Sequence, residues 1–295
     1  MSDPWGPLKL PLSDLAAGSL AGAAQVIVGQ PLDTIKVRAQ IAPPGMFKGP
    51  MDILTTTVRN EGVRGLFKGM ASPLLGIAAQ NSFLFAAFSV AKRAVSPTPD
   101  LSIGQVAAAG AMAGAANSLF ASPVELFKIR MQAQYGGKTD KTLAQVAREI
   151  WHKHGFRHGV MRGFWVTVLR ETPAYAGFYG AFEGTKRTLR ANLYPDLAKD
   201  APPPLWVLMV SGSAGGIANW LACYPIDVVK SRVQLSTAPL HGLGYIPRAF
   251  AEVAREQGLG GFIRGLSPTL LRAIPAAAAT FTTFELAKDA LDRAD

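Results

Sequence analysis

Long uncharged stretches alternate with polar segments along this chain. Four stretches lack Asp, Glu, Lys and Arg: residues 15–32, 69–91, 101–124 and 201–226. They are 18, 23, 24 and 26 residues long, and about 20 apolar residues are needed for a helix to cross a bilayer. Two further stretches, about 164–182 and 266–284, would qualify without the interruptions Arg170, Glu171 and Arg272. The pattern therefore predicts six membrane-spanning helices.

The polar segments between the paired spans hold most of the positive charge. Residues 36–68, 128–162 and 230–264 contain 6, 8 and 5 basic residues, against 2 acidic residues each. Their summed excess of 13 exceeds the net charge of +10 for the whole chain. Because basic loops gather on one side of a membrane, we expect these segments on one face and both termini on the other. The bases are not interleaved with aromatic residues as in a nucleic-acid-binding surface, so we expect no nucleic-acid partner.

Composition and motif searches exclude several other classes. The chain has 295 residues, of which 49% are hydrophobic and 17% charged, which is too apolar for a disordered protein. Cys223 is the single cysteine, so an internal disulfide and a multi-cysteine zinc site are excluded. His152, His154 and His158 are interpreted as a solvated surface, and we expect no metal site. No nucleotide-binding fingerprint or catalytic triad occurs, and we expect no enzyme and no cofactor.

A motif of the form Pro-x-acid-x-x-Lys-x-Arg-x-Gln occurs three times, starting at Pro31, Pro123 and Pro225. The copies are 92 and 102 residues apart, and each ends an odd-numbered span. The sequence thus predicts an all-α membrane protein built from three tandem pseudo-repeats. It has six transmembrane helices and three short amphipathic helices in one transmembrane domain. The repeats are expected at residues 1–98, 99–199 and 200–295.

Small residues four positions apart recur in the odd-numbered spans. They are Gly18 and Gly22, Gly110 and Gly114, and Gly212 and Gly216. Such pairs let helix backbones approach closely in lipid, and we interpret them as helix-packing residues.

The acid and the lysine of each motif are three residues apart, so they share one helix face. Ionised groups in a membrane helix are tolerated where they face the bundle interior and pair. With threefold repetition, each acid can reach the lysine of the next repeat. The proline removes a backbone hydrogen bond and kinks the helix toward the bundle axis. The expected ring joins Asp33, Glu125 and Asp227 to Lys36, Lys128 and Lys230, and it either opens as a gate or permanently fixes the helix ends.

The triplicated motif resembles that of the mitochondrial carrier family, over about residues 12–288. The resemblance implies that the ring is a gate on the matrix side, braced by Gln40, Gln132 and Gln234. It also implies a monomer in the mitochondrial inner membrane, with both termini facing the intermembrane space. The glycines at the starts of the even-numbered spans, Gly69, Gly163 and Gly265, correspond to the family's cardiolipin-binding positions.

The family also has an outer, cytoplasmic ion-pair network on the even-numbered helices. The matching residues here are Lys92, Glu183, Lys186, Glu285 and Lys288. Ser89 stands where the first repeat would have an acid, so at most two outer pairs can form. We expect a weaker outer gate than a full set of three pairs would give.

Three positions at one level of the even-numbered helices resemble the family's substrate contact points. They are Gly76-Ile77, Arg170-Glu171 and Arg272-Ala273, with Gln80 one turn beyond the first pair. Two cations and one anion suit a small zwitterion, whose carboxylate would bind Arg170 or Arg272 and whose ammonium would bind Glu171. A structural pair between Arg170 and Glu171 is the alternative.

The pair Arg170-Glu171 resembles the carnitine/acylcarnitine and ornithine branch of the family. Carnitine, ornithine-like and neutral amino acids such as glycine all remain open as substrates, and exchange is the expected mode of transport. A carrier-shaped scaffold that transports nothing is the alternative from another class, and a soluble helical-repeat binding protein is a third.

Overall fold

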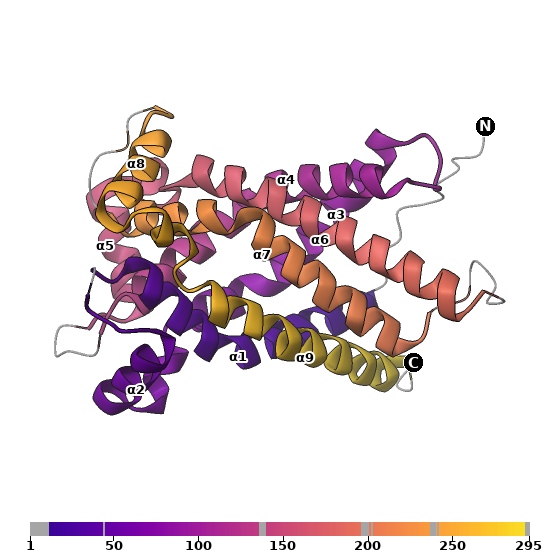
Figure 1. Cartoon of the computed structure of the whole chain (residues 1–295), viewed down its shortest axis with the longest axis horizontal. Coiled ribbons are helices and arrows are strands. Elements are labelled where there is room, and N and C mark those ends of the chain that lie inside the picture. The colour runs from indigo at the N-terminus through magenta and orange to yellow at the C-terminus, as the bar shows by residue number, and fades with distance from the viewer. Residues whose placement is uncertain are drawn as a thin grey trace.

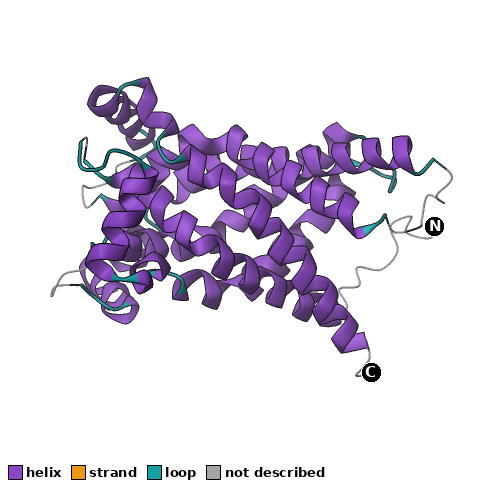
Figure 2. Cartoon of the chain, turned by 60° about the horizontal axis from the view of Figure 1, so that its bottom comes forward, coloured by secondary structure: helices purple, strands orange, loops and turns teal. Residues whose placement is uncertain are grey.

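The computed structural model describes residues 12–43, 45–135, 140–195, 201, 203–236, 240 and 242–292. Its long helices are α1 (Leu12–Ile41), α3 (Ala71–Val95), α4 (Ile103–Gln132), α6 (Phe164–Leu193), α7 (Leu205–Leu235) and α9 (Leu266–Asp292). Its short helices are α2 (Pro50–Glu61), α5 (Leu143–Gly155) and α8 (Tyr245–Gln257). No strand occurs in these ranges (Figure 2). The predicted all-α fold is confirmed, and each odd-numbered span continues as helix through its charged motif.

The six long helices form a closed bundle in chain order. Neighbouring pairs pack from α1 to α3, α4, α6, α7 and α9, and α9 packs back against α1. The short helices α2, α5 and α8 lie together at one end of the bundle, on the left in Figure 1, and α9 ends at the opposite end. We call these the surface-helix end and the terminal end. Residues 1–11 lie outside the described residues, so the position of the N-terminus stays a prediction.

The outside of the bundle is apolar. Large side chains of the long helices are strongly exposed, for example Leu75 (81%), Leu271 (65%) and Leu286 (66%). Within the described residues, the segments Val63–Val95 and Leu205–Leu235 are long and apolar enough to cross a membrane. Charged, polar and small residues lower the mean hydropathy of the other long helices. An apolar surface of this extent needs a lipid or protein partner.

The inside of the bundle is unusually polar. The side chains of Lys230, Asp227, Arg170 and Glu171 are buried, as are three glutamines of the repeated motif. Buried charges are tolerated where they pair with one another and make hydrogen bonds. An apolar outside around a charged inside is the pattern expected when lipid surrounds the bundle.

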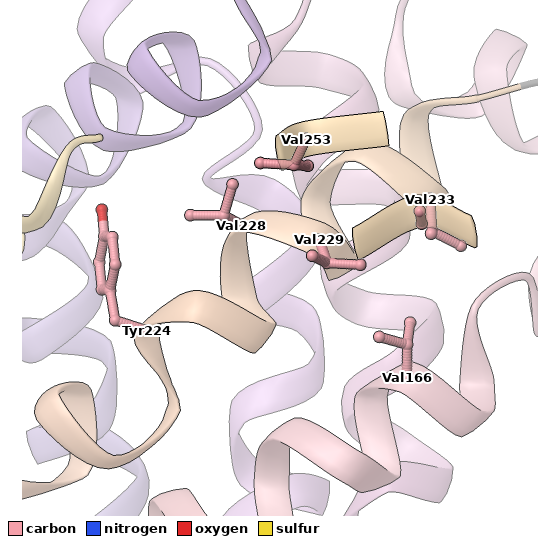
Figure 3. Packing of buried hydrophobic residues seen from close by; sticks show 7 residues of the cluster. Val166, Tyr224, Val228, Val229, Val233 and Val253 are labelled. Carbon is pink, nitrogen blue, oxygen red and sulfur yellow. The ribbon is translucent and has the colours of Figure 1, made fainter. Parts of the chain in front are cut away.

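The largest apolar cluster lies at the surface-helix end and joins three helices. Val166 of α6 and Val253 of α8 pack against four residues of α7, which are Tyr224, Val228, Val229 and Val233 (Figure 3). A smaller cluster joins Leu126 of α4 to Val146 and Ile150 of α5. The two clusters thus pack the surface helices α8 and α5 against α7 and α4, two of the helices that carry the charged motif.

The glycine pairs allow close helix contacts at most of the expected positions. A Cβ atom built on Gly110 or Gly114 of α4 would lie 2.6 Å from a backbone carbonyl oxygen of α6. On α1, a Cβ atom at Gly22 would meet the side chains of Ile77 and Asn81 on α3. Gly18 differs, because nothing lies within 4 Å of a Cβ atom built there. The packing interpretation is therefore wrong for Gly18.

Candidate functional site

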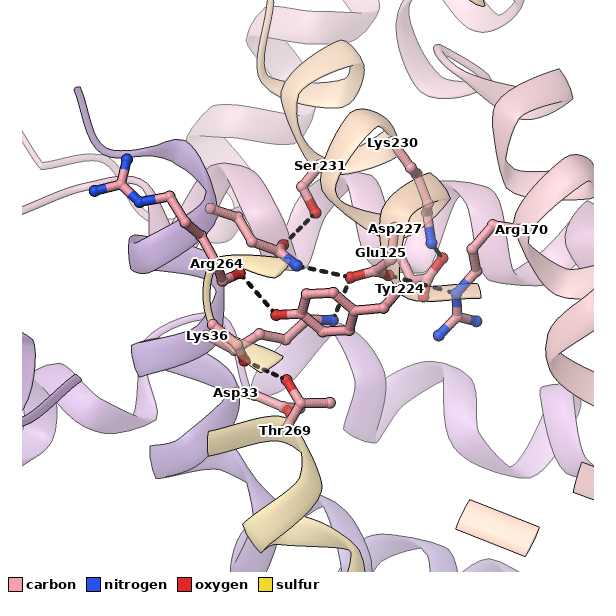
Figure 4. Close-up of polar contacts among 12 residues, drawn as sticks. Asp33, Lys36, Glu125, Arg170, Tyr224, Asp227, Lys230, Ser231, Arg264 and Thr269 are labelled. Carbon is pink, nitrogen blue, oxygen red and sulfur yellow. Dashed lines mark hydrogen bonds and ion pairs between the residues drawn. The ribbon is translucent and has the colours of Figure 1, made fainter. Parts of the chain in front are cut away.

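Three ion pairs form a ring that links α1, α4 and α7, the helices that carry the charged motif. Asp33 of α1 pairs with Lys128 of α4, and Glu125 of α4 pairs with Lys230 of α7. The Lys36 Nζ of α1 lies 2.6 Å from the Asp227 Oδ2 of α7, which closes the circle. Figure 4 labels Asp33, Lys36, Glu125, Asp227 and Lys230 of this ring. We call the six residues of the three ion pairs the inner ring.

Each ion pair joins the acid of one repeat to the lysine of the next, as the spacing predicts. The geometry arises because the motif proline is followed by an acid and a lysine three residues apart on one face. Lys36 and Lys230 are buried, with 7% and 1% exposure, whereas the Lys128 side chain is 18% exposed. A lysine as buried as Lys36 or Lys230 resists losing its partner unless another charged group replaces it.

The three motif glutamines are all fully buried but play unequal roles. Gln40 donates from Nε2 to the Asp227 Oδ2 at 3.0 Å and accepts from the Ser231 hydroxyl at 2.9 Å. Gln132 instead donates to the Thr34 hydroxyl at 3.1 Å. Gln234 donates at 3.4 Å to the backbone carbonyl of Ser122, a residue of α4. One expected brace thus contacts an inner-ring carboxylate directly, while the other two tie neighbouring helices together.

A cavity of about 240 Å³ lies directly against the inner ring. All six inner-ring residues line it. The expected substrate-contact residues that line it are Ile77, Gln80, Arg170, Glu171 and Arg272. Gly76 is not among the lining residues, and a Cβ atom built there would lie 2.7 Å from the Val124 side chain of α4. Gly76 is therefore a position of close packing between α3 and α4.

The two arginines that line the cavity, Arg170 and Arg272, both contact carboxylates of the inner ring. Arg170 pairs with the adjacent Glu171, the arrangement expected of a structural pair. Its Nε also lies 3.4 Å from the Asp227 Oδ1. The Arg272 Nη1 lies 2.9 Å from the Asp33 Oδ1. Two carboxylates of the inner ring therefore share their charge between a ring lysine and a cavity arginine.

Sequence reasoning missed four polar or aromatic lining residues, which are Asn117, Tyr175, Trp220 and Ser231. The Lys36 Nζ lies 4.1 Å from the centroid of the Trp220 ring, and the Arg170 Cζ lies 5.0 Å from it. The Asn117 Oδ1 is buried without a hydrogen-bond partner among the described residues. An amide in the middle of an uncharged span was a signal that could have been used for Asn117. Trp220 lies in an apolar stretch where an aromatic residue carries no such signal.

The expected outer network lies at the terminal end. The Glu183 carboxylate pairs within α6, with the Lys186 Nζ at 2.6 Å and the Arg187 Nε at 2.7 Å. The Lys92 Nζ lies 5.1 Å from the centroid of the Phe88 ring on its own helix, α3. Glu285 and Lys288 lie near the end of α9. These two ion pairs of Glu183 are thus local to one helix, whereas the inner ring joins different repeats.

The three expected lipid-contact glycines lie just before α3, α6 and α9, and the backbone of each is in the left-handed region. Their φ values are 79° for Gly69, 76° for Gly163 and 82° for Gly265. A Cβ atom at Gly69 would also lie 2.8 Å from the backbone oxygen of Lys128 in the next repeat. Gly69 is therefore required both by the turn and by the seam between repeats.

The described residues contain no group of three side chains placed to hold a metal ion. The bundle consists of three helical repeats that surround a charged cavity. Ion pairs close this cavity at one end, and the outer surface of the bundle is apolar. These features define a membrane carrier. The family model described as mitochondrial carrier protein matches residues 9–98, 99–193 and 201–295. The chain belongs to this family, whose members transport small metabolites and are not enzymes, and its relatives imply the mitochondrial inner membrane.

Similar proteins carry several transport names. Mitochondrial substrate carrier family protein S of Dictyostelium discoideum is 37% identical, over 93% of this chain and 96% of its own. A mitochondrial carnitine/acylcarnitine carrier-like protein of Arabidopsis thaliana is 34% identical, over 99% and 100%. Mitochondrial ornithine transporter 1 of Rattus norvegicus is 35% identical, over 93% of each chain. Other relatives are named for the transport of arginine, basic amino acids and glycine.

Proposed function

We propose that this protein carries a small zwitterionic metabolite across the mitochondrial inner membrane by alternating access. The substrate is carnitine or an acylcarnitine, or an amino acid such as ornithine, and it moves in exchange for a second solute. A neutral, glycine-like amino acid is the alternative substrate. The named substrates of the relatives all combine a carboxylate with a cationic nitrogen, which supports this class.

The charges of the cavity favour such a ligand. The inner ring contains three acids and three lysines, which balance one another. Arg170, Arg272 and Glu171 remain, with one net positive charge. A carboxylate can bind an arginine through two parallel hydrogen bonds, and Glu171 can accept an ammonium group. The cavity of about 240 Å³ is smaller than the roughly 300–1,000 Å³ of sites for drug-sized ligands, which favours a small metabolite.

One observation carries the mechanism: the cavity arginines contact carboxylates of the inner ring. Arg272 lies 2.9 Å from Asp33, and Arg170 lies 3.4 Å from Asp227. A substrate carboxylate that binds these arginines competes with both aspartates. Binding therefore weakens the inner ring and lowers the free energy needed to open it. The same contacts reform after release, so the empty cavity favours the closed ring.

The orientation follows from charge. The surface-helix end contains the three basic segments, so it faces the matrix, and the inner ring is the matrix gate. Both termini face the intermembrane space. Glu183, Lys186, Glu285, Lys288 and Lys92 form the outer gate when the inner ring is open.

The proposal also includes cardiolipin binding and a monomeric state. The backbone N–H groups that begin α3, α6 and α9 suit the phosphates of cardiolipin, beside Gly69, Gly163 and Gly265. The cavity and the inner ring are formed within one chain, which supports a functional monomer.

Thermal unfolding of the purified protein tests the substrate class. Carnitine, acylcarnitines, ornithine, arginine, lysine, glycine and ADP are added singly, because a ligand that binds the native state raises the unfolding temperature. We expect a rise with at least one zwitterion and none with ADP. Glu171→Ala should remove the rise, whereas Arg255→Ala on the exposed face of α8 should keep it.

Uptake into proteoliposomes tests the site. Arg272→Ala removes a charge-assisted hydrogen bond worth about 1.5–3 kcal/mol, so we expect uptake to fall by about tenfold to a hundredfold while the protein remains folded. Normal uptake by this variant would contradict the site. A rise in the unfolding temperature with ADP alone would contradict a zwitterionic substrate. A folded wild type that binds and transports none of the panel would favour the scaffold.

A further inference from the structure

In the first and third repeats, the arginine two residues after the motif lysine pairs with a glutamate of the next surface helix. In the first repeat, the Arg38 Nη1 lies 2.5 Å from the Glu61 Oε1 at the end of α2. In the third repeat, the Arg232 Nη1 lies 2.6 Å from the Glu256 Oε2 near the end of α8. Burial would raise the pKa of Glu61, but hydrogen bonds from Arg38 and Lys68 outweigh it and lower this pKa. Glu61 is thus held in its charged form.

The second repeat lacks the carboxylate. His154 precedes Gly155 where Glu61 precedes Gly62, and both glycines have the same left-handed backbone, with φ of 65° and 68°. The residue before His154 is also not an acid but a lysine, Lys153. The turn that follows is also different. Residues Phe156–Val160 form a π turn, whereas Val63–Phe67 and Leu259–Ile263 form 3-10 turns. The π turn accommodates the one extra residue of this repeat.

The corresponding arginine, Arg130, is consequently left without an ion pair among the described residues. Its Nη2 donates to the backbone oxygen of Ser236 at 3.3 Å. Its Nε is buried and has no hydrogen-bond partner there. A buried donor without a partner costs free energy, so the site favours any acceptor that can reach Arg130.

A cavity of about 390 Å³ opens beside Arg130, where the ends of α4 and α7 meet α5. Its charged or titratable lining residues are Arg130, Lys141, Lys153, His154 and Glu149. Glu149 accepts from the Lys141 Nζ at 2.5 Å and the Lys153 Nζ at 2.6 Å. These hydrogen bonds lower the pKa of Glu149 to about 2, so one negative charge faces three positive ones.

We propose that this cavity binds a phosphate-bearing anion, whose oxygens take the place of the carboxylate that the second repeat lacks. Guanidinium groups bind phosphate through paired hydrogen bonds, and the two lysines add positive charge. Val146, Ile150 and Leu235 also line the cavity, so it can cover an apolar part of the same ligand. No residue lines both this cavity and the central one. The anion joins α4 to α5 and α7, and it stabilises the closed surface-helix end independently of the transported substrate.

Thermal unfolding in detergent with increasing inorganic phosphate tests the proposal, with sodium chloride added to match ionic strength. We expect a saturable rise in unfolding temperature. Arg130→Gln should abolish it. Arg232→Gln, at the corresponding position of the third repeat, should lower the starting temperature but keep the rise.

A second pair of variants keeps the test valid if Arg130→Gln fails to fold. His154→Glu supplies the missing carboxylate, so it should raise the starting temperature and remove the response to phosphate. His152→Glu adds the same charge on the exposed face of α5, outside the cavity lining, and should keep the response. Loss of the response in both variants would overturn the proposal, since it would reflect surface charge alone.

The source of the phosphate is distinguished by repeating the measurement in lipid nanodiscs, in a buffer without inorganic phosphate. In one arm inorganic phosphate is added to phosphatidylcholine discs, and in the other arm phosphatidic acid is included in the discs and no inorganic phosphate is added. A rise in either arm that is lost in His154→Glu and kept in His152→Glu supports the site, and the arm that responds identifies a soluble or a lipid phosphate. No rise in either arm, or a rise that persists in folded Arg130→Gln, would overturn it.

Discussion

Replacing Asp227 with Asn removes one charge from the inner ring with little change of shape. The carboxylate accepts from the Lys36 Nζ at 2.6 Å and from the Gln40 Nε2 at 3.0 Å, and it lies 3.4 Å from the Arg170 Nε. Asparagine keeps one oxygen that can accept from Gln40. It cannot balance Lys36, whose side chain is only 8% exposed. The variant therefore leaves a buried cation without its counter-charge.

The structure sets the size of the effect. Removing one partner of a buried ion pair costs about 3–5 kcal/mol. Lys36 still lies over the Trp220 ring at 4.1 Å, which partly stabilises the cation, so we expect the lower value. About 3 kcal/mol is about a hundredfold in an equilibrium constant. The ratio of closed to open inner rings should fall by this factor.

Cys223 provides the assay, because it is the single cysteine and is fully buried four residues before Asp227 on α7. A water-soluble maleimide reacts with it when this part of α7 opens, so the labelling rate follows the open population. We expect Asp227→Asn to be labelled about a hundredfold faster than the wild type. Glu252→Gln, on the exposed face of α8, should stay within about twofold.

A double variant tests whether charge is the cause. Lys36→Met combined with Asp227→Leu removes both charges, and apolar replacement of a buried pair is often neutral or stabilising. This variant should be labelled at nearly the wild-type rate. Wild-type labelling of Asp227→Asn, or equally fast labelling of the double variant, would refute the reasoning.

Three further predictions concern stability and the opening of the inner ring. Gly114→Val places a side chain against a backbone oxygen of α6 and should destabilise the protein by about 1–3 kcal/mol, whereas Gly18→Ala enters open space and should be nearly neutral in thermal unfolding. Burial raises the pKa of Glu61, but hydrogen bonds from Arg38 and Lys68 outweigh this effect, so the pKa lies below 4.5. The ion pairs of Glu61 therefore stabilise the fold above about pH 4.5 and are lost as the pH falls through the lowered pKa. Glu61→Gln should therefore reduce the acid sensitivity of the unfolding temperature, and equal sensitivity would contradict this. Trp220→Leu removes the aromatic face over Lys36 and should accelerate Cys223 labelling, through a loss of about 0.5–2 kcal/mol; an unchanged rate would show that the ring contributes packing alone.

The fold was predictable because the strongest sequence signals were also the structural ones. Uncharged stretches gave the long helices, and the triplicated motif gave the pairing of each acid with the next lysine. Helix ends were less accessible from hydropathy. Helix α1 continues through Asp33, Lys36 and Arg38 to Ile41, because charges that face the bundle interior do not interrupt a helix.

Individual contacts in the cavity depended on tertiary packing that repetition does not encode. Gln40 braces the inner ring, whereas Gln132 at the same motif position bonds Thr34. Gly76 packs against α4 instead of lining the cavity. The contact between Arg272 and Asp33 joins the last helix to the first, and no spacing within one repeat could indicate it.

The closure of α9 against α1 has a consequence for biogenesis. Lys36 lies far before its partner Asp227 along the chain, and Asp33 contacts Arg272 of the final helix. Contacts between such distant parts of a chain form late. A nascent chain that ends before the third repeat therefore contains an unmatched cation at the edge of an unclosed bundle. The charges of α1 therefore find all their partners only when the last helix completes the circle.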